Sequence, residues 1–299
     1  MQTYYLSTNK QYSLTIHTFE VEHPVAVVHI VHGVEEHQDG YEPLARFLNQ
    51  NGFCVITSDI GETTRGSRHI SHFKDHDGYL DLLSDQIQIR DFAARAYPDC
   101  PVFLLAHSTG SILGHVLLKF QAPAYEKAVF SSYSCYSCIT KFALFCASVI
   151  CKRRGPTYRS AFLQKISYKV FRQNFYIPPN DIDWICYNPD SFQPGVENPN
   201  YNIAFTVAGF RDLFRLVELM HYHKNYHNVN PDMPLLFLYG ANDPCVGGKK
   251  GSNRSRNVLR KAGYQNISSI CYPDAGHDIL NQSYKDTVYQ DILSFLQEK

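Results

Sequence analysis

The sequence lacks an excess of charge of either sign. Its 299 residues contain 28 Lys and Arg against 28 Asp and Glu, so the formal net charge is zero. Proteins that bind nucleic acid present a basic surface that gathers phosphates, and a neutral chain provides no such long-range field. The composition therefore argues against a nucleic-acid-binding protein. A content of 44% hydrophobic and 19% charged residues also excludes a disordered chain and indicates a globular protein.

The sequence also lacks an apolar run long enough to cross a bilayer. The most apolar segment, Phe142–Cys151, lies between Lys141 and Lys152 and has about half of the roughly 20 residues that a spanning helix needs. Residues 1–14 are polar and rich in tyrosine, without the apolar run after a basic start that marks a signal peptide. The nine cysteines are odd in number and scattered, which indicates reduced thiols. We therefore expect a cytoplasmic protein.

Short runs rich in β-branched and aromatic residues alternate with longer amphipathic stretches. This alternation is typical of a mostly parallel sheet covered by helices, so we expect an α/β fold. The expected strands are 4–7, 13–20, 25–32, 53–58, 102–105, 128–131, 235–239 and 267–271, and the first two can pair as a hairpin. The expected helices between them are 42–50, 79–97, 111–120, 252–262 and 283–297.

The alternation stops between residues 133 and 232, where helical patterns occur without a convincing strand. We expect an inserted helical cap, or lid, over 133–232 and a core formed by 1–132 and 233–299. The clearest cap helix has an apolar face and an opposite polar face. The apolar face carries Phe210, Leu213, Phe214, Val217 and Met220, and the polar face carries Arg211, Asp212 and Arg215.

The most informative motif follows an expected strand and precedes a helix. It reads Ala106-His-Ser-Thr-Gly110, a small-x-Ser-x-Gly pattern centred on Ser108. A nucleophile elbow has this pattern because its sharp strand-to-helix turn leaves room only for small residues two positions before and after the serine. Ala106 stands where glycine is more usual. We expect Ser108 to be a nucleophile.

A serine hydroxyl needs a histidine base that a carboxylate orients. The apolar stretch 235–240 leads to Asp243, at the sheet edge where α/β proteins bind ligands. His277 follows the last expected strand in a loop that contains glycine. The order Ser108, Asp243, His277 is that of the α/β-hydrolases and differs from the order in the chymotrypsin and subtilisin folds. We expect these three residues to form a catalytic triad.

The expected strand 25–32 ends in His32-Gly33, which suggests the site of the oxyanion donors. In this geometry the residue after the glycine turns its backbone N–H toward the nucleophile. We therefore assign the oxyanion hole to the backbone N–H groups of Val34 and Thr109. Such donors stabilise the tetrahedral oxyanion, and the loss of one typically costs about 3 to 4 kcal/mol.

Taken together, these motifs resemble the monoacylglycerol lipase and bacterial lysophospholipase family of serine aminopeptidase-like hydrolases. The similar segments are His32-Gly33 followed by Glu36-His37 and Tyr41, then Pro101–Gly110, Tyr239–Pro244 and Gly276–Asn281. The resemblance implies an α/β-hydrolase fold with a mostly parallel eight-stranded sheet and a cap, an acyl-enzyme intermediate and no cofactor. It also implies esters of glycerol or glycerophospholipids as substrates, above all monoacylglycerols or lysophospholipids. The sequence departs from the family at Ile60–Ser67, where a glycine- and histidine-rich turn is usual.

The expected cap carries the one strong charge bias of the chain. Between Lys141 and Phe175 there are eight basic residues and no acidic one. A basic and apolar helix favours an anionic membrane surface, so peripheral membrane contact through the cap is one interpretation. The other interpretation is an ordinary solvated face beside an apolar contact with the core.

Two rival functions remain open beside ester hydrolysis. A proline iminopeptidase-type aminopeptidase shares the fold and the triad, but it needs an anionic site for a free amine, which a basic cap does not favour. A catalytically inactive hydrolase fold could instead serve as a binding protein. We expect no metal and no cofactor, because no histidine or cysteine motif completes a closed metal shell and the serine mechanism needs none. Oligomeric state does not follow from the sequence.

Overall fold

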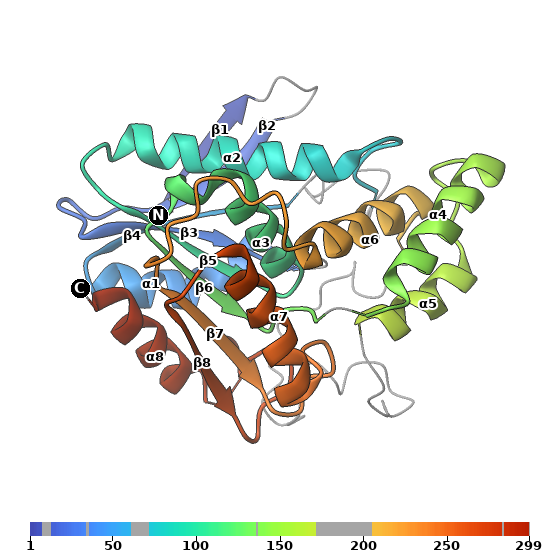
Figure 1. Ribbon diagram of the computed structural model, residues 1–299. Coiled ribbons are helices and arrows are strands. Elements are labelled where there is room, and N and C mark those ends of the chain that lie inside the picture. The colour runs from blue at the N-terminus through green and yellow to red at the C-terminus, as the bar shows by residue number, and fades with distance from the viewer. Residues whose placement is uncertain are drawn as a thin grey trace.

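A sheet of eight strands forms the centre of the molecule (Figure 1). The computed structural model describes residues 1–7, 13–33, 36–60, 72–135, 137–171, 205–282 and 284–298. The strands lie in the order β1 (Gln2–Ser7), β2 (Ser13–Phe19), β4 (Phe53–Ser58), β3 (Ala26–Val31), β5 (Val102–His107), β6 (Lys127–Ser131), β7 (Leu235–Gly240) and β8 (Ile267–Tyr272). β2 pairs antiparallel with β1 and β4, and every other neighbouring pair is parallel. The predicted mostly parallel eight-stranded sheet is confirmed.

The central strands are buried on both faces. β3, β4, β5 and β7 are buried along their whole length, as expected for parallel strands covered by helices on both sides. Successive side chains of a strand point to opposite faces. On β3, Val27 and Val31 belong to one apolar cluster, whereas Val28 and Ile30 belong to the other. The sheet therefore divides the core into two layers.

Helices cover both faces of the sheet. One layer contains α1 (Glu42–Gln50) and α8 (Lys285–Gln297), and the opposite layer contains α2 (Gly78–Ala96), α3 (Thr109–Gln121) and α7 (Gly248–Ala262). Short 3-10 turns at Gln38–Tyr41 and Ala122–Ala124 precede α1 and follow α3. Because the strands from β3 onward are parallel, the loops after β3, β5, β6, β7 and β8 gather at one edge, where ligands of α/β sheets bind.

The expected cap segment contains three described helices, α4 (Thr140–Arg154), α5 (Ala161–Phe171) and α6 (Val207–His221). Their shared apolar cluster includes Ala143 and Ala147 of α4, Leu163 of α5, and Phe210 and Phe214 of α6. α4 and α5 lie at one end of the molecule, beyond α6 (Figure 1). Residues 136 and 172–204 of the segment lie outside the described residues, as does 61–67, the larger part of the loop that departs from the family pattern.

α6 packs on the sheet as well as on α4 and α5. Leu216, Val217 and Met220 belong to the same cluster as the sheet, while Phe210 belongs to the cluster shared with α4 and α5. The prediction that Asp212 lies on a solvent-facing side of this helix is wrong, because Asp212 is 1% exposed. The polar face of α6 is thus interrupted by a carboxylate that points into the protein.

The hydropathy of the described helices agrees with the sequence on one further point. In the described ranges, no helix has both the length and the apolar character that a membrane span requires.

Candidate active site

The turn between β5 and α3 holds Ser108 in a strained conformation. Ser108 has φ 52° and ψ −121°, a backbone geometry that residues with a side chain rarely adopt. Gly110 is required there, because a Cβ at this position would lie 2.1 Å from the carbonyl oxygen of Val31. The Ser108 N–H donates to the carbonyl of Ser131 over 2.9 Å, which ties the turn to the end of β6. The sequence pattern that predicts an elbow therefore has its steric cause in the close approach of α3 to β3.

The structure brings Ser108, His277 and Asp243 together in one hydrogen-bonded line. His277 Nε2 lies 2.8 Å from Ser108 Oγ, and His277 Nδ1 lies 2.9 Å from Asp243 Oδ2. Asp243 comes from the loop after β7 and His277 from the loop after β8, both at the carboxyl edge of the sheet. With a proton on Nδ1, Nε2 is an acceptor aimed at the serine hydroxyl, the arrangement that a general base requires.

The loops that carry Asp243 and His277 are fixed by the main chain around them. The other oxygen of Asp243, Oδ1, accepts the N–H of Cys245 over 2.8 Å. The Ser132 hydroxyl donates to the carbonyl of His277. Gly240 allows the two loops to touch, since a Cβ there would lie 2.2 Å from the carbonyl oxygen of Gly276. These contacts fix the main chain of the two loops, and with it the positions from which Asp243 and His277 extend.

Burial and charge act in opposite directions on His277. Burial on its own lowers the pKa of the imidazole, because it disfavours the charged form. The charge and hydrogen bond of Asp243, together with those of Cys245, outweigh burial, so the pKa of His277 lies well above its ordinary value of 6.5. The site thus stabilises the imidazolium that forms when the base takes up a proton.

The two expected oxyanion donors differ in how far the structure describes them. Thr109 is the first residue of α3, and the first N–H groups of an α-helix have no acceptor within the helix. Its N–H is therefore free of the helical ladder directly beside Ser108. Val34 lies outside the described residues.

Gly33, which precedes Val34, is held at both ends of its backbone. Its N–H donates to Glu36 Oε2 over 2.7 Å, and its carbonyl oxygen lies 2.6 Å from Nδ1 of His32. His32 Nε2 accepts the N–H of Ile60 over 3.0 Å, so its proton is on Nδ1 and that nitrogen donates to Gly33. The main chain at the end of β3 therefore has one defined conformation beside the triad.

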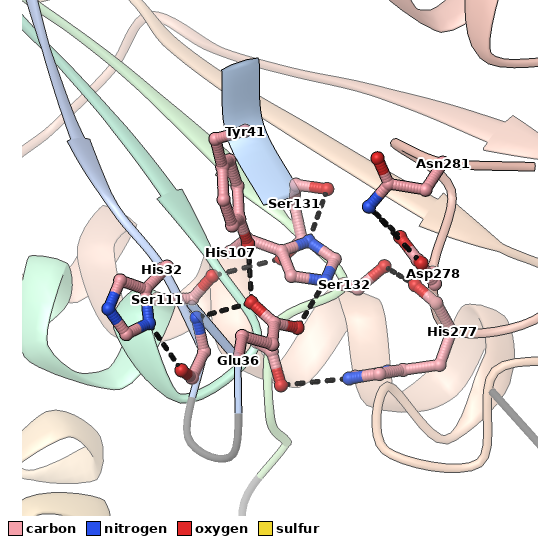
Figure 2. A network of polar contacts seen from close by, with 12 residues as sticks. His32, Glu36, Tyr41, His107, Ser111, Ser131, Ser132, His277, Asp278 and Asn281 are labelled. Carbon is pink, nitrogen blue, oxygen red and sulfur yellow. Dashed lines mark hydrogen bonds and ion pairs between the residues drawn. The ribbon is translucent and has the colours of Figure 1, made fainter. Parts of the chain in front are cut away.

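Sequence reasoning missed a second histidine beside the nucleophile. His107 is 1% exposed, and its ring centre lies 5.6 Å from that of His277. Figure 2 shows His107 between Glu36 and Ser131, with Tyr41 beside Glu36. The x position of a small-x-Ser-x-Gly motif carries no rule for its side chain, so nothing in the pattern pointed to it.

Among the described residues, one group of metal-ligating side chains lies close together. The donor atoms of Asp243, Cys245 and His277 are all within 4.8 Å of one another. The 2.9 Å between His277 Nδ1 and Asp243 Oδ2 is a hydrogen-bond distance, and the same imidazole also contacts Ser108. Two of the three groups, Asp243 and His277, are thus already paired with each other in the line that ends at Ser108.

The sequence profile of the family described as serine aminopeptidase, S33, matches residues 22–283, most of the chain. The chain belongs to this family. The resemblance inferred from the motifs is thereby confirmed.

Two curated relatives of this S33-family chain match short segments. Phospholipase YtpA of Bacillus subtilis (strain 168) is 34% identical over 107 residues, which are 35% of this chain and 38% of the relative. The monoglyceride lipase of Homo sapiens is 31% identical over 104 residues, which are 34% of this chain and 32% of that lipase. The chain therefore spans about a third of the length of the curated relatives that it matches.

Solved structures match the S33-family chain over nearly its whole length. A thermostable carboxyl esterase from Bacillus coagulans, in complex with glycerol, covers 99% of this chain with a TM-score of 0.85 at 20% identity, and the match covers 97% of the esterase. A soluble variant of monoglyceride lipase from Saccharomyces cerevisiae, in complex with a substrate analog, has a TM-score of 0.73 at 16% identity over 99% of this chain and 94% of the lipase. At these identities the likeness concerns the fold, and the predicted α/β-hydrolase fold is confirmed.

Proposed function

We propose that the protein is a serine hydrolase that cleaves carboxylic esters through an acyl-Ser108 intermediate. The observation that carries this proposal is the line of two hydrogen bonds, 2.8 Å and 2.9 Å, from Ser108 Oγ through His277 to Asp243. Asp243 is fully buried, so its charge acts on the imidazole without screening by water. The strained backbone of Ser108 supports a nucleophilic rather than a structural serine.

The proposed reaction has two halves. In the first, Ser108 Oγ attacks the ester carbonyl while His277 Nε2 takes its proton, and the N–H groups of Thr109 and Val34 stabilise the oxyanion. His277 then gives the proton to the departing alcohol, which leaves the acyl group on Ser108. In the second half, His277 deprotonates a water that attacks the acyl carbonyl, and the acid is released with Ser108 restored.

We propose monoacylglycerols or lysophospholipids as the substrates. The names of the two curated relatives, a phospholipase and a monoglyceride lipase, support this class, although each match covers about a third of the relative. In this proposal residues 133–232 form the cap over a core of 1–132 and 233–299.

A series of esters of increasing acyl length tests the proposal against its rivals. Native protein and Ser108→Ala are compared on p-nitrophenyl esters, on monoacylglycerol and lysophosphatidylcholine, and on proline p-nitroanilide. We expect ester hydrolysis with a long-chain optimum that is lost in Ser108→Ala. Hydrolysis of the proline anilide alone would establish the aminopeptidase instead. No turnover of any substrate, together with no labelling of Ser108 by a fluorophosphonate, would leave an inactive binding protein.

We further propose that the cap touches an anionic membrane surface from a cytoplasmic location. On α4 and α5 and between them, large aromatic side chains face solvent: Phe142 is 56% exposed, Phe145 65%, Tyr158 43% and Phe162 53%. Exposed basic residues accompany them, and 141–172 contains no acidic residue. Aromatic rings that enter the headgroup region beside basic side chains favour an anionic bilayer.

The proposed cytoplasmic location is supported by the cysteines. The eight described cysteines are free thiols, which is typical of a reducing compartment.

Vesicle co-sedimentation tests the membrane proposal. The triple variant Lys152→Glu, Arg153→Glu, Arg154→Glu reverses the charge at the end of α4. Its matched control, Lys249→Glu, Lys250→Glu, Arg254→Glu, reverses three exposed charges on α7. We expect the α4 variant to lose binding to vesicles that contain phosphatidylserine, while the α7 variant keeps it. Equal binding by both variants and the native protein would remove the proposal.

A further inference from the structure

A polar connection runs from the loop after β3 to the end of β6, next to Ser108 in the chain. His107, the last residue of β5, lies at its centre: Nδ1 is 3.0 Å from Ser131 Oγ and Nε2 is 3.5 Å from Glu36 Oε1 (Figure 2). His107 and Ser131 are buried and end two neighbouring strands, whereas Glu36 is partly exposed in the loop after the neighbouring β3. We call these three residues the His107 bridge.

Glu36 reaches the main chain of the β3 loop as well as His107. Its Oε2 accepts the N–H of Gly33 over 2.7 Å and the hydroxyl of Tyr41 over 2.6 Å. The carboxylate also fills the space beside Gly33, since a Cβ there would lie 2.9 Å from it. Two donors therefore hold one oxygen of Glu36, while the other oxygen faces His107.

His107 has the properties of a neutral positioning group rather than of a second base. Burial, followed by the proximity of His277, lowers the pKa of His107 to about 4. Its Nε2 is buried and, in the described part of the chain, has no partner at hydrogen-bond distance, with Glu36 Oε1 as the polar atom opposite it. A neutral imidazole beside His277 leaves the positive charge of catalysis to His277 alone.

We propose that Glu36 and His107 are positioning residues for the nucleophile. Glu36 fixes the Gly33 main chain, and His107 ties the peptide before Ser108 to Ser131, whose carbonyl in turn accepts the Ser108 N–H. The strained turn at Ser108 would otherwise relax toward an ordinary backbone conformation. This inference rests on the function proposed above, because it needs Ser108 to be the reacting atom.

Substitutions at Glu36 separate hydrogen bonding from charge. Glu36→Gln keeps an oxygen that can accept from Gly33 and Tyr41, whereas Glu36→Ala keeps none. We expect Glu36→Ala to lower kcat, and the rate of Ser108 labelling by a fluorophosphonate, by roughly 10²-fold with little change in KM, as a misplaced reacting group does. Glu36→Gln should restore most of both rates. A folded Glu36→Ala that labels as fast as the native protein would overturn the proposal.

A second buried histidine provides a matched control. His115, on α3, is also 1% exposed, its pKa is also lowered to about 4 by burial, and its Nε2 likewise lacks a partner at hydrogen-bond distance among the described residues. It bonds the carbonyl of Ser111 but lies outside the His107 bridge. We expect His107→Asn to slow labelling about tenfold or more, since displacement of a reacting group costs up to about 10², and His115→Asn to leave the rate of the folded protein unchanged.

Labelling of the native protein and labelling of the two histidine variants together separate this inference from the proposed function. Absence of Ser108 labelling in the native protein would overturn both. Labelling of the native protein that is slowed equally by His107→Asn and His115→Asn would overturn only the positioning role, because it would indicate a general loss of packing. If Glu36→Ala does not fold, the comparison of His107→Asn with His115→Asn decides, with circular dichroism to establish that both are folded.

Discussion

α6 and α4 lie in the same segment, between β6 and β7, and share an apolar cluster, yet they bury opposite kinds of side chain. α6 buries Phe210 and Phe214 and extends its contacts into the core through Leu216 and Val217. α4 buries small residues such as Ala143 and Ala147 and leaves its phenylalanines in solvent. A helix that turns its largest apolar groups outward has them available for a partner. The comparison indicates that the large apolar side chains of α6 stabilise the core, whereas those of α4 lie on the surface.

Two polar contacts of α6 with the core accompany this difference. Lys119 of α3 donates to the carbonyl oxygens of Leu219, over 3.2 Å, and Tyr222, over 2.5 Å, at the end of α6. Near the start of α6, the Asp212 carboxylate lies against Gly78, where a Cβ would come within 2.5 Å of it. α6 therefore contacts α2 in its first half and is bonded to α3 at its end.

Substitution of one phenylalanine in each helix tests this difference between α6 and α4 most directly. Phe214→Ala removes a fully buried ring stacked on Phe210, and we expect it to lower the free energy of unfolding by about 3 to 5 kcal/mol. Phe145→Ala removes a ring that is 65% exposed, and we expect a change within about 0.5 kcal/mol. Urea unfolding measures both. Equal losses would contradict the assignment of α6 to the core and α4 to the surface.

The Asp212 contact predicts a pH dependence of known sign. Burial, opposed by Arg211 and by the N–H groups of Tyr79 and Gly78, raises the pKa of this carboxyl to about 7. Between pH 3.8, the pKa in the unfolded chain, and about pH 7, the native state binds more protons at this carboxyl than the unfolded state does. The free energy of unfolding of the protein therefore falls as pH rises through that window. Asn has no charge to bury, so Asp212→Asn should exceed the native protein in free energy of unfolding by on the order of 2 to 4 kcal/mol at pH 8, and the two should be about equal at pH 3, below both pKa values.

The exposed Asp232 supplies the control for this measurement. Asp232→Asn should leave stability unchanged at both pH values. An Asp212→Asn protein that is less stable than the native one at pH 8 would show that the ionised carboxylate stabilises the start of α2, which is the opposite of our expectation.

The Lys119 contact predicts a smaller effect. Lys119→Met leaves two carbonyl oxygens at the end of α6 without their donor, and we expect a loss of about 1 to 3 kcal/mol in unfolding free energy. Lys152→Met at the exposed end of α4 should change stability by less than about 0.5 kcal/mol. A loss at Lys152 as large as that at Lys119 would mean that α4 is anchored as firmly as α6.

The parts of the fold that repeat a simple period were predictable from the sequence. The strands were predicted to within two residues at their ends. For β3, β4, β5, β6 and β7 the cause is burial on both faces, which produces continuous apolar runs. The helix α6 followed from its apolar spacing, and the elbow followed from the small residues around Ser108. The placement of Ser108, Asp243 and His277 on one line agrees with their order along the chain.

The parts that depend on contacts between distant segments were not predictable. Asp212 lies inward because the start of α2, more than a hundred residues earlier, provides N–H groups opposite it. α4 was given no bounds from the sequence, and its largest apolar side chains, Phe142 and Phe145, face solvent rather than the core. The His107 bridge joins the ends of two strands to the loop after a third, and a pattern within one segment contains no information about such a meeting point.

The pH dependence of Ser108 labelling by a fluorophosphonate, followed by intact-protein mass spectrometry in the native protein and in Asp243→Asn, tests the central claim most directly. Only neutral His277 can accept the serine proton, and Asp243 raises the pKa of that imidazole, so the native rate should rise with pH through a midpoint above 6.5. Asp243→Asn should label more slowly, by on the order of 10³- to 10⁴-fold, with a lower midpoint. A rate independent of pH, or equal in the two proteins, would contradict activation of Ser108 by His277 and Asp243.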